Sequence, residues 1–329
     1  MKNCLFILFT FLLCFSCFHK AYGQKEKPYS YKINENIPDS IKNNLHKIDS
    51  TILSYLRKGE FDKFENIMSP RLKEKVPNSA EIVSSFKELM PKGNFSYKDE
   101  YWIKHATPGT QHPIISPFMT YYINHNSSNE EEYVSLRLAK DKLYTFMLLS
   151  IYTKGENGWN LETLTGGVYS TYGKTGLDYY QLSQRALEKG YILNAYLHML
   201  CGKDAMNPGG PYFQYQQKNE VIAYEASLVK LMVSTFQFPR ILEGIEGKPE
   251  ILGVQPQIIQ EGIFPLIIYQ TDISLDDKQE LERQNDQVKE KIEDIFPGIR
   301  SFGSYLLYRV FNRETIETGQ IYQFIEKNE

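Results

Sequence analysis

Residues 143–165, LYTFMLLSIYTKGENGWNLETLT, decide the fold. The first ten are apolar on both faces of an extended strand, with Leu143, Met147, Leu149 and Ile151 on one face and Tyr144, Phe146 and Leu148 on the other. A half-exposed antiparallel strand would be polar on one face, so we expect this strand to be covered on both. Asn157-Gly158 is a strong signal for a tight turn into a second strand. The stretch therefore predicts an antiparallel hairpin with a second cover, for which the helices expected over residues 178–236 are the nearest candidates.

Period-two alternation of apolar and polar residues predicts three more strands before this hairpin. They cover about residues 95–103, 119–123 and 134–138, and Asp141-Lys142 is a plausible tight turn after the last of them. Together with the hairpin, these segments predict a curled antiparallel sheet of roughly five strands.

Three helices are expected before the sheet. The first begins at Asp39 or Ser40 and ends at Gly59, because its apolar residues recur at steps of three and four. That stripe consists of Ile41, Leu45, Ile48, Ile52 and Tyr55. A short helix follows over residues 61–68, and a third runs from Ser79 to about Met90.

Two motifs in residues 40–168 resemble a known family. Leu56-Arg-Lys-Gly-Glu-Phe61 resembles the turn between the first helices of exported nuclear transport factor two-like proteins, and Gly158-Trp-Asn-Leu161 is similar to their last strand. The resemblance implies a cone-like fold in which a bent sheet wraps the N-terminal helices. Members of that family include enzymes, ligand-binding pockets and interaction domains, so the resemblance implies no single function.

The rest of the chain is expected to form a helical segment and a small domain. Residues 169–238 are predicted to be helical and to pack on the sheet, and residues 239–261 read as a linker rich in glycine and proline. Residues 262–329 are predicted to form a small α+β domain from a strand at 264–271, a helix at 275–295 and a strand at 305–311. Two or three strands would make a thin sheet. The chain as a whole is therefore predicted to be α+β.

The N-terminus has the pattern of an export signal. Lys2 precedes an apolar run, and Ala21-Tyr-Gly23 is a small-x-small cleavage site, so residues 1–23 are interpreted as a signal peptide and 24–38 as a flexible tether. The run is shorter than the ~20 apolar residues of a membrane span. The alternative is a lipoprotein anchored through Cys17, which follows Ser16 in a loose lipobox. The protein is thus predicted to be periplasmic or secreted, with membrane attachment only if Cys17 is lipidated.

Charge and cysteine content exclude several classes of function. The formal net charge is −3 and becomes −5 once the signal is removed, so the basic surplus of a nucleic-acid-binding protein is missing. Export also separates the chain from cytosolic nucleotides, so no nucleotide or other cofactor is expected. Cys201 is the one cysteine after the signal and cannot form an internal disulfide.

Three short motifs resemble catalytic signatures but lack the context that the chemistry needs. Gly173-Lys-Thr175 is not a phosphate loop, because the glycine required five residues earlier is Val168. Ser84-Ser-Phe-Lys87 resembles the first motif of penicillin-binding acyl-transferases, yet the Lys-Thr-Gly motif at 174–176 opens a helix instead of lining a strand. His198 and Cys201 lie three apart on a helix without nearby metal-ligand partners, so they are interpreted as a buried thiol beside a hydrogen-bonded imidazole, and no metal site is expected.

Two weak candidate sites remain. His105 and Asp99 could form an acid–base pair in a polar pocket of the cone, although loop or surface histidines are the simpler reading. Trp102, Tyr101 and Tyr122 could form an aromatic wall for a ligand, although aromatic residues in strands are more often part of a core.

These observations predict an exported, non-catalytic protein of the bacterial cell envelope that binds a partner protein or an envelope ligand. The alternative is a hydrolase or isomerase that uses a polar pocket in the cone-like domain. Polar groups converging inside the cone would favour the enzyme, whereas an apolar patch outside it would favour the binding protein.

Overall fold

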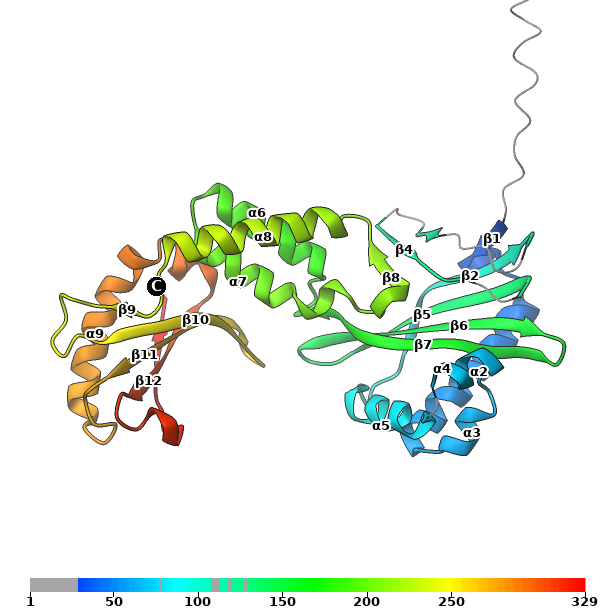
Figure 1. Ribbon diagram of the computed structural model, residues 1–329, viewed down its shortest axis with the longest axis horizontal. Helices are drawn as coiled ribbons and strands as arrows, with labels where there is room; N and C mark the ends of the chain where they lie inside the picture. Colours follow the sequence, from blue (N-terminus) through cyan, green and yellow to red (C-terminus); the bar gives the residue numbers. More distant parts are fainter. Residues whose placement is uncertain (1–28, 77, 108–112, 117–119, 127–128, 329) are drawn as a thin grey trace, which may run out of the picture.

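The structure is a computed structural model that describes residues 29–76, 78–107, 113–116, 120–126 and 129–328. The expected signal peptide and Cys17 lie outside the described residues. With 40 % helix and 34 % strand and with mainly antiparallel sheets, the chain has the α+β class that its sequence predicts. Figure 1 shows an N-terminal lobe and a C-terminal lobe joined by a layer of helices.

The helices of the N-terminal lobe lie where the apolar stripes predict them, with one addition. They are α2 (Asp39–Lys58), α3 (Phe61–Glu65), α4 (Pro70–Lys75) and α5 (Ser79–Leu89). Helix α2 ends at Gly59, whose φ of +73° is a left-handed conformation that favours glycine. Helix α4 was not expected, and it begins where the Ser69 side chain accepts a hydrogen bond from the Leu72 N–H.

The main sheet has five antiparallel strands in the order β1-β2-β5-β6-β7. The strands are β1 (Tyr29–Ile33), β2 (Ser96–His105), β5 (Glu131–Lys140), β6 (Tyr144–Gly155) and β7 (Gly158–Thr171). Strand β1 corrects the expectation of a flexible tether over residues 24–38. Residues 29–33 pair with β2 along their whole length, and the turn η2 (Asn34–Asn36) leads from them into α2.

A second, three-stranded sheet consists of β3 (Ile114–Ile115), β4 (Tyr121–Ile123) and β8 (Phe213–Tyr215). The strand expected over 119–123 therefore lies outside the main sheet. Side chains of this small sheet, including Tyr121 and Phe213, pack on Met147 and Leu149 of β6. Phe146, on the other face of β6, packs beneath the N-terminal helices. Strand β6 is thus covered on both faces as predicted, but strands rather than the expected helices supply much of the outer cover.

The layer between the lobes begins with α6 (Gly176–Glu188), α7 (Ile192–Gly202) and the short turns η3 (Asp204–Met206) and η4 (Gly210–Tyr212). It continues after β8 with α8 (Lys218–Thr235). Helix α6 starts at a capping box, in which the Thr175 hydroxyl accepts from the Asp178 N–H and the Asp178 carboxylate accepts from the Thr175 N–H.

The C-terminal lobe contains a five-stranded sheet in the order β13-β12-β11-β10-β9. Its elements are β9 (Arg240–Ile241), β10 (Glu250–Ile259), β11 (Gly262–Thr271), α9 (Lys278–Ile295), η5 (Ile299–Phe302), β12 (Tyr305–Asn312), η6 (Ile316–Thr318) and β13 (Tyr322–Lys327). The predicted strand, crossover helix and strand are β11, α9 and β12, and the two strands are parallel. Residues 239–261 are not a linker, because β9 and β10 belong to this sheet.

One hydrophobic core joins the helical layer to the C-terminal sheet. Leu197 of α7 and Phe236 after α8 are buried in the same cluster as Val288 of α9 and Tyr308 of β12. The segment 169–238 therefore packs on both lobes and not on the N-terminal sheet alone. Among the described residues, no helix combines the length and the apolar character that crossing a bilayer requires.

Candidate functional site

The structure does not bring His105 and Asp99 together as an acid–base pair. They lie six residues apart on β2, which corresponds to about 20 Å of extended strand. The Asp99 carboxylate accepts a hydrogen bond from the Tyr121 hydroxyl and lies 3.1 Å from the Lys98 ammonium. Each member of the expected pair is thus engaged with a different partner.

His105 belongs to a buried cluster with Glu132 and His125. Its Nε2 lies 2.8 Å from Glu132 Oε2, and His125 Nδ1 lies 2.5 Å from Glu132 Oε1. Burial by itself would raise the pKa of Glu132, but the two imidazoles outweigh it through hydrogen bonds and charge, and the net pKa is lowered. All three residues are at most 7 % exposed. This arrangement ties the end of β2 to β5 and offers little access to a substrate.

The three aromatic candidates do not form one wall. Tyr101 is fully buried in the core beneath the small sheet, and its hydroxyl lies 3.0 Å from that of Tyr121. Trp102 is the next residue on β2 and packs instead with the helices on the opposite face of the sheet. Lys32 and Lys104 both lie over the Trp102 ring, and its Nε1 donates to Glu131. Tyr122 is half-buried on β4.

Polar groups do converge between α2 and the main sheet, at positions that the sequence reasoning missed. Asp49 of α2 pairs with Arg137 of β5 at 2.8 Å, and its carboxylate accepts hydrogen bonds from the hydroxyls of Tyr97, Ser135 and Tyr152. Burial and the neighbouring Asp49 charge raise the pKa of Tyr97 and Tyr152, so both phenols stay protonated and act as donors. The buried charge is thereby paired and hydrogen-bonded.

A second carboxylate, Glu100, lies at the outer end of this network. It accepts hydrogen bonds from the Tyr133 hydroxyl and from His46 Nε2, the latter at 2.5 Å, and lies 3.5 Å from the Lys42 ammonium. The His46 ring stacks on Tyr97 with 3.9 Å between the ring centroids, which connects the two carboxylate clusters.

The polar groups between α2 and the main sheet are therefore engaged with one another inside a mainly apolar core. Asp49 is 0 % exposed and Arg137 is 2 % exposed, so neither can contact a substrate. A signal for them exists in the sequence. Asp49 interrupts the apolar stripe of the first helix between Leu45 and Ile52, and a charged residue on a buried stripe needs a buried partner.

The surface best suited to recognition is the open face of the C-terminal sheet. Helices cover the other face, where Ile267, Tyr308 and Val310 point into the core. Because side chains alternate along a strand, Leu266 and Leu307 point away from that core. The pairing places Leu266, Leu307 and Ile325 in one row across β11, β12 and β13, and Ile325 is 70 % exposed. Leu307 is half-buried and Leu266 is only 1 % exposed, so the row is open at Ile325 and covered at Leu266.

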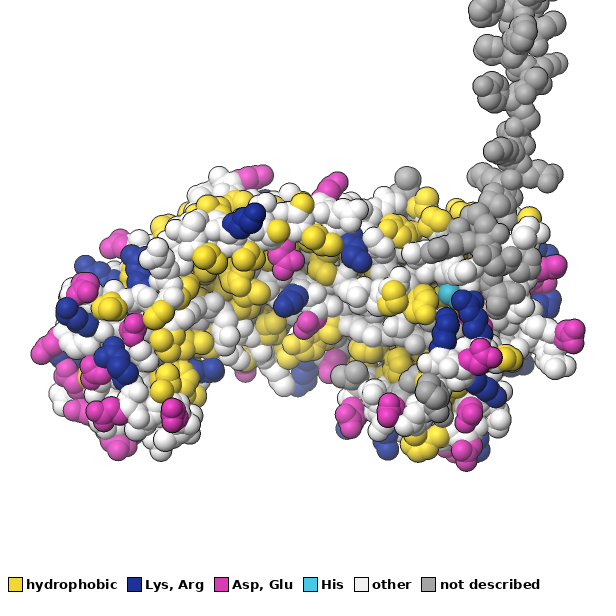
Figure 2. Space-filling model, in the orientation of Figure 1, with side chains coloured by type: hydrophobic (Ala, Val, Ile, Leu, Met, Phe, Trp, Pro, Cys, Tyr) yellow, Lys and Arg dark blue, Asp and Glu magenta, His cyan; other side chains and the backbone are white. Residues whose placement is uncertain are grey.

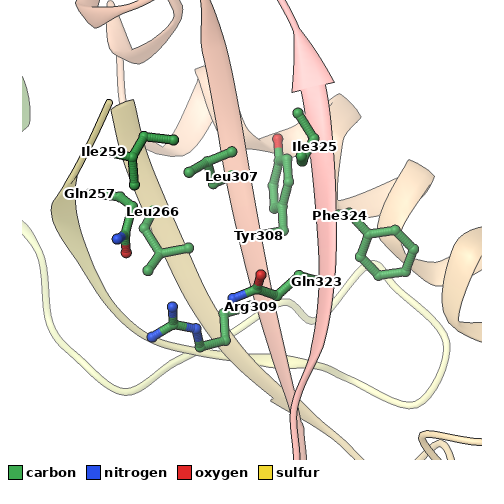
Figure 3. Close-up of a pocket in the computed structure, with 9 residues that line it drawn as sticks. All are labelled: Gln257, Ile259, Leu266, Leu307, Tyr308, Arg309, Gln323, Phe324 and Ile325. Carbon is green, nitrogen blue, oxygen red and sulfur yellow. The ribbon is translucent and has the colours of Figure 1, made fainter. Parts of the chain in front are cut away.

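A hollow of about 190 Å³ lies at the apolar row. Figure 3 shows Leu266, Leu307 and Ile325 on neighbouring strands, with the Arg309 guanidinium below Leu266. In Figure 2, hydrophobic side chains form a band over the C-terminal lobe. Strand β13 is the edge of the sheet and pairs only with β12 among the described strands, so its outer backbone N–H and C=O groups are available for another strand.

Within the described residues, no group of three or more His, Cys, Asp or Glu side chains has the geometry to hold a metal ion. No family model, curated protein or solved structure matches the chain.

Proposed function

We propose that this chain is an exported, non-catalytic binding protein of the bacterial cell envelope, and that it binds an extended segment of a partner protein at the edge of its C-terminal sheet. The observation that carries the proposal is the exposed Ile325 on the free edge strand β13, beside the half-buried Leu307 of β12. A free edge supplies main-chain hydrogen bonds to an added strand, and apolar positions beside it select alternate side chains.

The composition of β13 supports this assignment. Edge strands usually carry protective charges or bulges against unwanted pairing, yet Ile325 is highly exposed near the middle of β13. Glu326 points to the covered face, where its carboxylate accepts from the Tyr308 hydroxyl and pairs with Arg300 at 2.6 Å. Strand β13 is therefore held in place by interactions on the covered face of the sheet, and its other face, with Ile325, remains exposed.

The rival hydrolase or isomerase receives no support from the geometry of the cone. It would need polar groups that face an accessible pocket, whereas Asp49 and Arg137 are buried and paired with each other. His105 and Asp99 have separate partners. The apolar surface lies outside the cone, as a binding protein requires.

The proposal can be tested with a phage-displayed library of random dodecapeptides against the mature chain, residues 24–329. We expect enrichment of peptides in which apolar residues alternate with polar ones, because such peptides would match the two-residue period of a strand. The variant Ile325→Asp should weaken their binding by about tenfold or more.

Ile241→Asp is the matched control. Ile241 is an exposed isoleucine, 49 % accessible, on β9 at the opposite edge of the same sheet. Equal loss of binding in the two variants would overturn the proposal, as would a library with no enrichment on the wild-type protein. A solution dimer that Ile325→Asp dissociates would replace the partner protein with a second copy of this chain.

A further inference from the structure

A second hollow lies where the helical layer meets both lobes. It has a volume of about 400 Å³ and is lined by side chains from the end of β7, from α6 and α7, and from the C-terminal lobe. The lining residues are Tyr172, Lys174, Tyr179, Leu182, His198, Cys201, Ile263, Ser301 and Phe302. This volume falls in the lower part of the range of roughly 300–1,000 Å³ for small-molecule sites.

The aromatic walls of this interlobe cleft are held in place before any ligand binds. The Tyr172 hydroxyl donates to the carbonyl of Ile259 at the tip of the C-terminal sheet. The Tyr179 hydroxyl donates to the Thr171 carbonyl at 3.0 Å, and the Phe302 ring lies against His198 with 4.6 Å between centroids. Fixed rings lose little conformational entropy when a ligand packs on them.

The charge of the cleft is positive. Lys174 is an exposed ammonium on its rim, and no Asp or Glu is among the described residues that line it. Burial, together with the positive charges of Lys174 and Arg185, lowers the pKa of His198 to about 4. The imidazole is therefore neutral, and its buried Nδ1 has no hydrogen-bond partner among the described residues. Because Nδ1 is closed to solvent, an anionic oxygen of a ligand would meet the Lys174 ammonium at the rim, with the imidazole in the wall beside it.

Covalent use of the thiol does not fit this environment. Burial raises the pKa of Cys201 to about 12, so the thiol is protonated near neutral pH and acts as an apolar part of the wall. The cleft thus combines the exposed Lys174 ammonium, a neutral imidazole and an aromatic and aliphatic lining.

We propose that the interlobe cleft binds a small amphipathic monocarboxylate, with its carboxylate on Lys174 and its hydrocarbon part against Phe302, Tyr172 and Leu182. This proposal is independent of the binding surface on β13, because the two sites have no lining residue in common. A bound ligand would touch the helical layer and the C-terminal lobe at once and would stabilise their contact by mass action.

Isothermal titration calorimetry with phenylacetate, 3-phenylpropanoate, indole-3-acetate and octanoate tests this proposal on the mature chain. We expect at least one of these acids to bind, and 3-phenylpropan-1-ol, the uncharged match to 3-phenylpropanoate, to bind about tenfold or more weakly than its acid. Lys174→Met should remove the preference for the acid over the alcohol, whereas Lys174→Arg should retain it.

Two further variants separate a cleft site from general surface binding. Leu182→Trp fills the cleft and should abolish binding of acid and alcohol alike, and Lys189→Met removes a lysine outside the cleft and should change neither. Unchanged melting temperatures would confirm that the variants are folded. The proposal is overturned if none of the four acids binds the wild-type protein, or if binding survives both Lys174→Met and Leu182→Trp.

Discussion

At the scale of single residues, His198 shows how burial next to cations controls protonation. Its imidazole lies among apolar and aromatic side chains of the interlobe cleft, and burial is the larger cause of its lowered pKa, ahead of Lys174 and Arg185. A lowered folded-state pKa means that the unfolded chain binds a proton at a pH where the folded protein does not. His198 therefore lowers the stability of the folded protein in mild acid.

We predict that His198→Asn makes the protein less sensitive to acid. In the wild type, the free energy of unfolding should fall by up to about 3 kcal/mol as the pH drops from 6.5 to about 4, because His198 titrates near 6.5 when unfolded and near 4 when folded. Urea unfolding of both proteins at several pH values over this range measures the difference. If the free energy of unfolding fell equally with pH in the variant and the wild type, His198 would not be held neutral in the folded protein.

At the scale of secondary-structure elements, α2 is fixed to the main sheet by a polar contact inside an apolar interface. Leu45, Ile52 and Leu56 pack against the sheet on the same stripe as Asp49, which pairs with Arg137. A buried ion pair contributes little net stability compared with apolar side chains of the same shape, but the loss of one partner leaves a buried charge unpaired. The Asp49–Arg137 pair therefore fixes how α2 lies on β5.

We predict a marked asymmetry between single and double substitutions at this pair. Asp49→Asn or Arg137→Met alone should lower the free energy of unfolding by about 3–5 kcal/mol, whereas Asp49→Leu combined with Arg137→Met should cost less than the sum of the single changes. Denaturant unfolding measures all of these values. Glu65→Gln, at an exposed acid on α3, is the control and should change stability by less than about 0.5 kcal/mol. If the loss in the double variant equalled the sum of the two single losses, Asp49 and Arg137 would not be energetically coupled.

At the scale of the whole molecule, the outer cover of the N-terminal sheet comes from two distant parts of the chain. Strands β3 and β4 lie between β2 and β5 in sequence, whereas β8 follows α7. Phe213 and Tyr215 of β8 are buried against Met147 and Leu149 of β6. Each such side chain contributes about 1.5–3 kcal/mol on burial, so the N-terminal lobe depends on the helical layer for its stability.

We predict that a fragment of residues 24–172 exposes this apolar face, because it contains β3 and β4 but lacks β8. The fragment should bind a hydrophobic dye strongly and associate in solution, whereas a chain of residues 24–329 should do neither to the same extent. Fluorescence titration and light scattering measure the two effects. In the full chain, Phe213→Ala should weaken the same contact and lower stability by about 3–5 kcal/mol. A monomeric fragment that ignores the dye would contradict this role of β8.

The local patterns of the sequence predicted much of the secondary structure, but not the positions of the segments with weak patterns. The stripe of α2, the alternation in β5, the apolar run in β6 and the β11-α9-β12 unit are local patterns, so they can be read from neighbouring residues. Strands β1 and β10 lie in segments whose composition suggested a tether and a linker, and β13 follows the last strand that the sequence predicted. Strand β1 pairs with β2, a partner far away in the chain, whereas β10 and β13 pair with their sequence neighbours β11 and β12.

The candidate sites show the same division between local pattern and tertiary contact. The sequence by itself determined the α+β class and the apolar character of β6 on both faces, because residue spacing decides which side chains share a face. Only the tertiary structure decided that His105 meets Glu132 instead of Asp99, that Asp49 meets Arg137, and that His198 and Lys174 line one cleft. These pairs join residues from separate elements, and the distance between such residues is set by how the elements pack. A one-dimensional pattern does not contain that information.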